Sequence, residues 1–162
     1  MTLTKEQIIH EFTESEAILR GHFILSSGLH SDTYMQCARV LMDPVRAAKL
    51  CAELAKKITD KLGKNFADIV VSPAMGGVVV GYEMARQLGL NAIFCERVNS
   101  QFQLRRGFEL PKGARALVLE DVITTGKSSL ETFELIEKYG AKIVAEGCLV
   151  DRSGENLDTI LK

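Results

Sequence analysis

The spacing of apolar residues along this chain switches between two periods. After Asp43-Pro44, apolar residues recur at helical spacing and predict a helix that ends at Gly63: Val45, Ala48, Cys51, Ala55, Ile58 and Leu62. Short apolar runs over 69–71, 92–95, 116–119 and 143–150 predict buried strands, with helical patterns over 78–88 and 127–139 between them. This alternation predicts an α/β fold with a mostly parallel sheet and right-handed crossovers.

The N-terminal part follows a different pattern. Thr4 and Gln7 form a capping box ahead of Ile8, which predicts a short helix. Residues 23–37 hold strand-like apolar pieces on both sides of a polar centre at 26–31, so we expect a loop between two strands there.

Composition limits the class of protein. The chain has 162 residues, 46% of them hydrophobic, and a net charge of −1, as expected for one globular domain with no general attraction to nucleic acid or anionic membranes. Its four cysteines lie inside apolar runs without metal-ligand spacing, which predicts reduced core thiols. With no signal-peptide pattern and no segment of transmembrane length, the sequence predicts a cytoplasmic protein.

The most informative stretch is 116–129, ALVLEDVITTGKSS. A buried strand leads to two carboxylates, Glu120 and Asp121, and then to a turn of small residues that opens the helix predicted over 127–139. Backbone N–H groups at a helix N-terminus attract anions, and Gly126 allows the chain to approach one closely. A P-loop is excluded because Asp121 occupies the position of its first glycine. Two acids before the turn suit a phosphorylated sugar, whose hydroxyls donate to them.

This stretch resembles the phosphoribosyl-pyrophosphate (PRPP) motif of type I phosphoribosyltransferases. The resemblance implies one domain over 1–162 with that family's fold: a central mostly parallel sheet flanked by helices at 41–155, preceded by an N-terminal helix and small hood at 1–40. It also implies PRPP contacts from the following residues: Arg97, Glu120, Asp121, Val122, Ile123, Thr124, Thr125, Gly126, Lys127 and Ser128. A second loop, at Ala74, Met75, Gly76 and Gly77, is where the family meets pyrophosphate.

Residues 97–113 correspond to the family's catalytic lid. The segment is rich in arginine and glycine and has no lysine before Lys112, so Arg105 or Arg106, with Arg97 and Asp121, is expected to do the catalytic work. We expect this segment to lack apolar anchors and to be disordered when open. A solvated hairpin is the alternative.

Within the family, the chain resembles the orotate enzymes, which make orotidine 5′-monophosphate and pyrophosphate for pyrimidine biosynthesis. That resemblance implies orotate contacts from Thr124, Arg152, Tyr34 and Ser27, Mg²⁺ held mainly through PRPP rather than by protein ligands, and a homodimer whose lid crosses to the neighbouring subunit. Two alternatives stay open: a purine phosphoribosyltransferase, and a non-catalytic regulator that binds PRPP. Arg152 disfavours the first, because a purine has no carboxylate to pair with it.

Overall fold

The computed structural model describes residues 3–24, 28 and 30–154. These residues belong to two compact units, Met1–Leu50 and Cys51–Lys162, and the boundary falls inside helix α3 (Pro44–Leu62). Within the described residues, no helix is both long enough and apolar enough to span a membrane.

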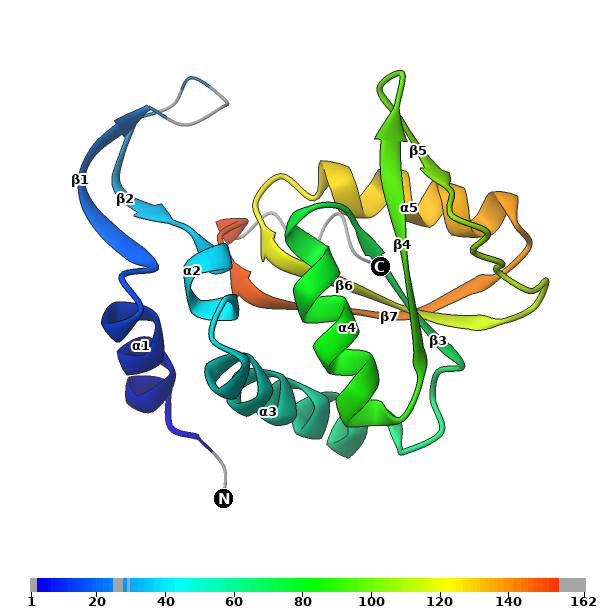
Figure 1. Cartoon of the computed structure of the whole chain (residues 1–162), viewed down its shortest axis with the longest axis horizontal. Coiled ribbons are helices and arrows are strands. Elements are labelled where there is room, and N and C mark those ends of the chain that lie inside the picture. The colour runs from blue at the N-terminus through cyan, green and yellow to red at the C-terminus, as the bar shows by residue number, and fades with distance from the viewer. Residues whose placement is uncertain (1–2, 25–27, 29, 155–162) are drawn as a thin grey trace. The chain divides into compact units, whose positions relative to one another are not determined.

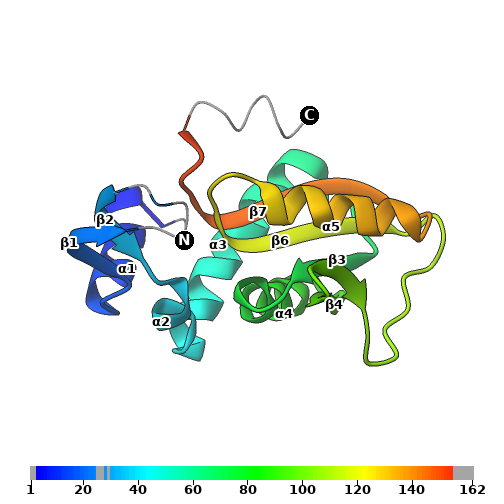
Figure 2. The ribbon, with the colours of Figure 1, turned by 90° about the horizontal axis from the view of Figure 1, so that it is seen from above.

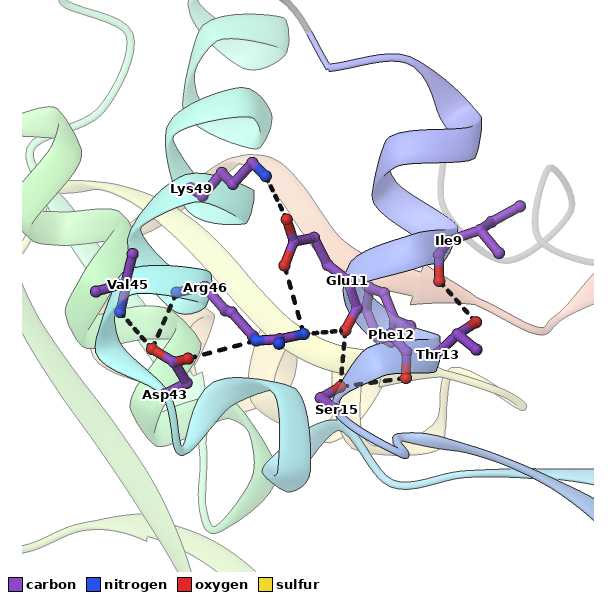
Figure 3. A network of polar contacts seen from close by, with 9 residues as sticks. All are labelled: Ile9, Glu11, Phe12, Thr13, Ser15, Asp43, Val45, Arg46 and Lys49. Carbon is purple, nitrogen blue, oxygen red and sulfur yellow. Dashed lines mark hydrogen bonds and ion pairs between the residues drawn. The ribbon is translucent and has the colours of Figure 1, made fainter.

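The first unit holds two short helices, a two-stranded antiparallel sheet and the start of α3. Its elements are α1 (Lys5–Glu14), β1 (Ile18–Ile24), β2 (His30–Met35) and α2 (Cys37–Leu41). The predicted capping box is present, since the Thr4 hydroxyl accepts from the Gln7 N–H and the Gln7 side chain accepts from the Thr4 N–H. Glu11 of α1 pairs with Lys49 and Arg46 of α3 (Figure 3). These ion pairs hold α1 against the first turns of α3.

The second unit is built on a five-stranded sheet of order β5-β4-β3-β6-β7. The strands are β3 (Ile69–Pro73), β4 (Asn91–Val98), β5 (Gln101–Leu104), β6 (Arg115–Ile123) and β7 (Lys142–Asp151). The four long strands are parallel and β5 is antiparallel, so the predicted parallel α/β sheet is confirmed.

Helices cover both faces of this sheet. Helix α4 (Gly76–Leu88) packs on one face of β3, β4 and β6, and α5 (Lys127–Lys138) lies on the other (Figure 2). The α5 face carries an apolar cluster that includes Val71, Val118 and Ile136. Residues 51–62 of α3 lie on the α4 face, where Leu54 and Ile58 contact β7 at Gly147.

Helix α4 approaches the sheet closely through glycines. A Cβ at Gly77 would lie 2.8 Å from the Leu119 carbonyl oxygen, whereas a Cβ at Gly81 would meet the Ser72 hydroxyl at 2.1 Å. A backbone carbonyl within a sheet cannot move aside, whereas the Ser72 hydroxyl can rotate away and leave the Ser72 Cβ, at 3.0 Å, as the tightest remaining contact of a Cβ at Gly81. Both glycines allow α4 to pack closely on the sheet. An added methyl group should be tolerated better at Gly81 than at Gly77.

We expect Gly77→Ala to lower the free energy of unfolding by about 1 to 3 kcal/mol, and Gly81→Ala to lower it less. The gain in helix propensity from Gly to Ala is larger at Gly81, inside α4, than at Gly77 in its first turn, and it adds to the difference expected from packing. Urea unfolding of the two variants measures it. An equal loss in both, or a larger loss at Gly81, would contradict this account.

Candidate active site

The polar loops of the second unit gather at one edge of its sheet. Because β3, β4, β6 and β7 are parallel, their carboxyl ends share that edge, where open α/β sheets bind ligands. Helix α4 starts there after β3, and α5 starts there after β6 (Figure 1). The Ala74 N–H donates to the Cys95 carbonyl, and the Arg152 N–H donates to the Ile123 carbonyl. Backbone hydrogen bonds thus join adjacent loops of the edge.

The turn after β6 forms an anion-binding hollow. Gly126 has φ 73°, in the left-handed region, and is the N-cap of α5. The hollow has a volume of about 60 Å³ and is lined by Glu120 and residues 122–129. Thr124 and Thr125 are exposed beside it. Free N–H groups at a helix start, together with hydroxyls in a hollow of this size, suit a phosphate group.

The two acids lie inside β6 rather than beyond it. Strand β6 extends to Ile123, four residues past the predicted end, so Glu120 and Asp121 point to opposite faces of the sheet. Glu120 lines the phosphate hollow, whereas Asp121 points to the start of α4. The acids therefore approach a ligand from two sides.

Burial dominates the electrostatics of these acids. It raises the pKa of Glu120 to about 8, and the negative charges of Asp121 and Glu146 add to the rise. Burial also raises the pKa of Asp121, although the Val122 N–H donates to its Oδ1 at 2.9 Å. Below about pH 8 the resting site therefore holds a proton on Glu120, which a ligand donating hydrogen bonds to that carboxyl would displace.

Stability should fall with rising pH because of Glu120. Its folded pKa of about 8 exceeds its ordinary 4.5, so between these values the folded state binds more protons than the unfolded state. The contribution is complete below pH 4.5 and is lost as pH rises towards 8. We expect Glu120→Gln to match the parent near pH 5 and to exceed it at pH 8.5 by a few kcal/mol. Urea unfolding across this range is the measurement. Glu137→Gln, at an exposed glutamate, should leave the pH dependence unchanged.

The loop between β3 and α4 depends on glycine. A Cβ at Gly76 would lie 2.5 Å from Asp121 Oδ1, so only glycine allows the helix start to come this close to the carboxylate. The Ala74-Met75 peptide is cis, and the Met75 side chain is 80% exposed. All four residues predicted for this loop thus lie at the sheet edge, with Gly76 against Asp121.

The predicted lid is an ordered hairpin. Strands β4 and β5 pair from Cys95↔Leu104 to Val98↔Gln101 around a two-residue turn at Asn99 and Ser100, both with positive φ. Figure 1 shows the hairpin reaching beyond the neighbouring strands. The expectation that 97–113 lacks apolar anchors is wrong, because Phe102 and Leu110 are buried. Disorder of an open lid stays a prediction. The alternation of polar and apolar residues in β5 covers only four residues. It was therefore too short to predict a strand in a segment rich in arginine.

The three lid arginines have different surroundings. Arg97 pairs with Glu131 of α5 and lies over the Phe102 ring, 4.2 Å from its centroid. Arg106 makes two hydrogen bonds to Glu96, at 2.8 and 2.9 Å. Within the described residues, the exposed Arg105 guanidinium makes neither a hydrogen bond nor an ion pair. Among the described residues, Arg105 is thus the lid arginine whose movement breaks no ion pair.

Three acids near the lid arginines and the acid pair were not predicted from the sequence. Glu96 and Glu131 hold the arginines, and Glu131 is also 3.9 Å from Lys127, four residues before it. Glu146 of β7 is diagonal to Glu120, because its neighbour Cys148 pairs with Glu120. Both carboxylate oxygens of Glu146 are buried, and neither forms a hydrogen bond of normal geometry. Burial raises the pKa of Glu146, and the nearby Ser129 hydroxyl lowers it in part. Only the i, i+4 spacing of Lys127 and Glu131 was visible in the sequence.

The residues predicted to contact the second substrate belong to different units of the structure, and one of them is not described. Thr124 and Arg152 lie at adjacent strand ends of the second unit, whereas the partly exposed Tyr34 belongs to β2 of the first unit. Ser27 lies outside the described residues. Tyr34 and Ser27 therefore stay predictions.

No three His, Cys, Asp or Glu side chains among the described residues converge to hold a metal ion. Mg²⁺ does not need such a cage, since it retains water and commonly binds through one or two carboxylates plus the substrate's phosphates. Glu120, which lines the phosphate hollow, and Asp121, which lies against the start of α4, are carboxylates of the kind that this requires.

Comparison with known proteins agrees with this geometry. Residues 42–159 match the family model described as "Phosphoribosyl transferase domain". An orotate phosphoribosyltransferase of Sphingopyxis alaskensis is 55% identical over 157 residues, covering 96% of this chain and 80% of the relative.

Solved structures extend the comparison. The crystal structure of orotate phosphoribosyltransferase from Aeropyrum pernix has a TM-score of 0.78 at 26% identity and covers 94% of this chain and 88% of its own. A crystal structure of adenine phosphoribosyltransferase has a TM-score of 0.73 at 15% identity, covering 94% of this chain and 95% of its own. At that identity, the second likeness shows the fold alone.

Proposed function

Because this chain belongs to the phosphoribosyl transferase domain family, we propose that it is an orotate phosphoribosyltransferase. It transfers the phosphoribosyl group of PRPP to N1 of orotate, giving orotidine 5′-monophosphate and pyrophosphate in pyrimidine biosynthesis. The observation that carries the proposal is the 55% identity to a relative of that name over 96% of the chain. The acid pair and phosphate hollow supply the matching chemistry.

Each part of PRPP has a counterpart at the sheet edge. The 5′-phosphate binds in the hollow formed by Thr124–Ser128, where N–H groups and hydroxyls converge. Glu120 and Asp121 accept hydrogen bonds from the ribose hydroxyls. The leaving pyrophosphate meets the Ala74–Gly77 loop and the lid arginines. The transition state is oxocarbenium-like, so catalysis needs positioning and charge rather than a covalent nucleophile.

Orotate is recognised through its carboxylate. Arg152 follows β7, and its N–H donates to the Ile123 carbonyl, which places it beside Thr124. An arginine pairs with a planar carboxylate through two parallel hydrogen bonds. The family resemblance also predicts orotate contacts from Tyr34 and Ser27.

Mg²⁺ is the proposed cofactor. It neutralises pyrophosphate charge when bound and is held mainly by PRPP, with Glu120 and Asp121 as the nearest acids. The cytoplasm is the proposed location, in keeping with the free thiols of the described cysteines.

A homodimer is the proposed active unit. Helix α4 exposes an apolar stripe next to the pyrophosphate loop: Met75 is 80% exposed, Val79 47% and Tyr82 70%. The spacing of these residues puts them on one side of the helix. A second copy seated on this stripe would lie beside the active site, within reach of a projecting β4–β5 hairpin. We therefore propose that the lid serves the neighbouring subunit.

Replacing Asp121 with asparagine tests the PRPP site. The substitution removes an acceptor charge from the ribose position but keeps the shape of the side chain. We expect weaker PRPP binding by calorimetry, by about tenfold or more. Asp60→Asn, on the exposed part of α3, is the matched control. Unchanged affinity in Asp121→Asn would contradict the ribose assignment.

A panel of bases tests the second substrate. With PRPP and Mg²⁺, orotate should be consumed and pyrophosphate released, whereas adenine and hypoxanthine should not react. Equal activity with a purine would overturn the orotate assignment. PRPP binding without turnover of any base would indicate the non-catalytic regulator.

A further inference from the structure

Two of the three histidines of this chain meet on the β1–β2 hairpin. His22 Nε2 lies 2.6 Å from His30 Nδ1, and the ring centroids are 4.8 Å apart. Both side chains are exposed. The third histidine, His10, is exposed on α1. No part of the proposed reaction uses the His22–His30 pair.

His22 is two residues before Ile24, the residue that pairs with His30, so both rings lie on one face of the hairpin, next to an irregularity in β1. Ile24 pairs with His30 and Phe23 with Ser31, but the next aligned pair is Arg20 with Thr33. Gly21 and His22 therefore share a single partner position on β2. Such a bulge adds one residue to a strand and changes the direction of the side chain it carries. Here it accompanies the approach of His22 to His30.

The pair presents two nitrogens that converge on one point. A neutral imidazole has one N–H and one lone pair, so in this contact one nitrogen donates and the other accepts. A metal ion can replace the shared proton if the donor ring moves its proton to its other nitrogen. Imidazole nitrogens bind zinc at about 2.0 to 2.1 Å, which sets the two nitrogens about 3 Å apart. A small rotation of two exposed side chains gives that spacing.

We propose that His22 and His30 form a bidentate site for a late first-row divalent ion, of the class of Zn²⁺ or Ni²⁺, which ties β1 to β2. Imidazole suits these ions better than Mg²⁺ or Ca²⁺, which prefer oxygen. No third ligand joins the pair within the described residues, so water fills the other coordination positions. Asp32, two residues after His30, already accepts a hydrogen bond from the Thr33 hydroxyl.

This site is independent of the proposed enzymatic function. It lies in the first unit, on the hairpin that also carries Tyr34. Metal binding joins the two strands near the end of the sheet where Ile24 pairs with His30. A two-stranded sheet is weakly stable alone. The ion therefore stabilises the hairpin as well as occupying a surface site.

Calorimetric titration of untagged, metal-free protein with Ni²⁺ tests the proposal. We expect saturable binding of one ion per chain. His22→Asn and His30→Asn should each weaken it by at least tenfold, because each leaves a single imidazole. His10→Asn is the matched control and should bind as the parent does. Circular dichroism and thermal unfolding without metal verify that the variants fold.

A second measurement tests whether the two histidines, rather than other side chains, are the metal ligands. Zn²⁺ added to ¹⁵N-labelled protein should shift the resonances of both imidazoles together, at one equivalent. Cys148→Ser excludes the half-buried thiol as the ligand and should change nothing. Full binding in either hairpin variant, or loss of binding in His10→Asn or Cys148→Ser, would overturn the proposal.

Discussion

Replacing Arg105 with alanine should lower kcat by about 10²- to 10³-fold while leaving both substrate KM values nearly unchanged. The leaving pyrophosphate gains negative charge only as the ribose–pyrophosphate bond breaks, so a cation that meets it then stabilises the transition state and not the ground state. Arg105 is suited to this role because its guanidinium makes no ion pair within the described part of the chain. Steady-state kinetics at saturating PRPP and orotate measure the change.

Arg106→Ala is the matched control. Arg106 makes two hydrogen bonds to Glu96, so its removal should loosen the hairpin and affect kcat less. A larger loss in Arg106→Ala than in Arg105→Ala would reverse the assignment. An increase in KM alone in Arg105→Ala would show that Arg105 binds the substrate equally in both states.

Mixed dimers can test whether the lid acts on its own subunit. An Arg105→Ala chain paired with an Asp121→Asn chain gives one site with both lesions and one with neither, if the lid crosses. Activity per mixed dimer should then recover towards half that of a parent dimer. If mixed dimers form, as native mass spectrometry would detect, but stay inactive, the lid serves its own subunit.

The second large effect is expected at Arg152. A charged bidentate contact to a desolvated carboxylate contributes about 2 to 4 kcal/mol, so Arg152→Ala should reduce orotate turnover by about two orders of magnitude or more. Its backbone hydrogen bond to Ile123 survives the substitution, so the loop should keep its place. kcat/KM for orotate, with PRPP saturating, is the quantity to compare.

Arg86→Ala provides the control for Arg152→Ala. Arg86 pairs with Glu83 on the surface of α4, and its loss removes an arginine without touching the sheet edge. PRPP affinity should be unchanged in both variants. If Arg152→Ala keeps orotate turnover within a few-fold of the parent, another group recognises the carboxylate.

Much of the fold follows from local patterns. The capping box at Thr4 predicted the start of α1, and short apolar runs predicted β3, β4, β6 and β7, because a buried parallel strand is apolar on both faces. These signals depend only on neighbouring residues. The ends of strands were predicted less well. Strand β6 continues through Glu120 and Asp121, because polar residues at a ligand-binding edge can still pair with the neighbouring strand.

The lid shows where local pattern fails. Its sequence has three arginines and two glycines, which favour mobility, but Phe102 is buried beside Cys95 and Leu135. Whether a single aromatic residue anchors a segment depends on what other parts of the chain place against it. The same holds for the lid arginines, whose acidic partners Glu96 and Glu131 are ten and thirty-four residues away in the chain.

The α/β alternation, the phosphate-binding turn and the acid pair before it can be predicted from the sequence, because each is encoded by residues adjacent along the chain. Four relations required the folded structure: Glu120 and Asp121 point to opposite faces, Gly76 packs against Asp121, His22 contacts His30, and Arg105 alone of the lid arginines lacks an ion pair within the described residues. These relations depend on strand register and on the approach of helices to the sheet. Such features arise from packing between distant segments, and no single stretch of sequence contains them.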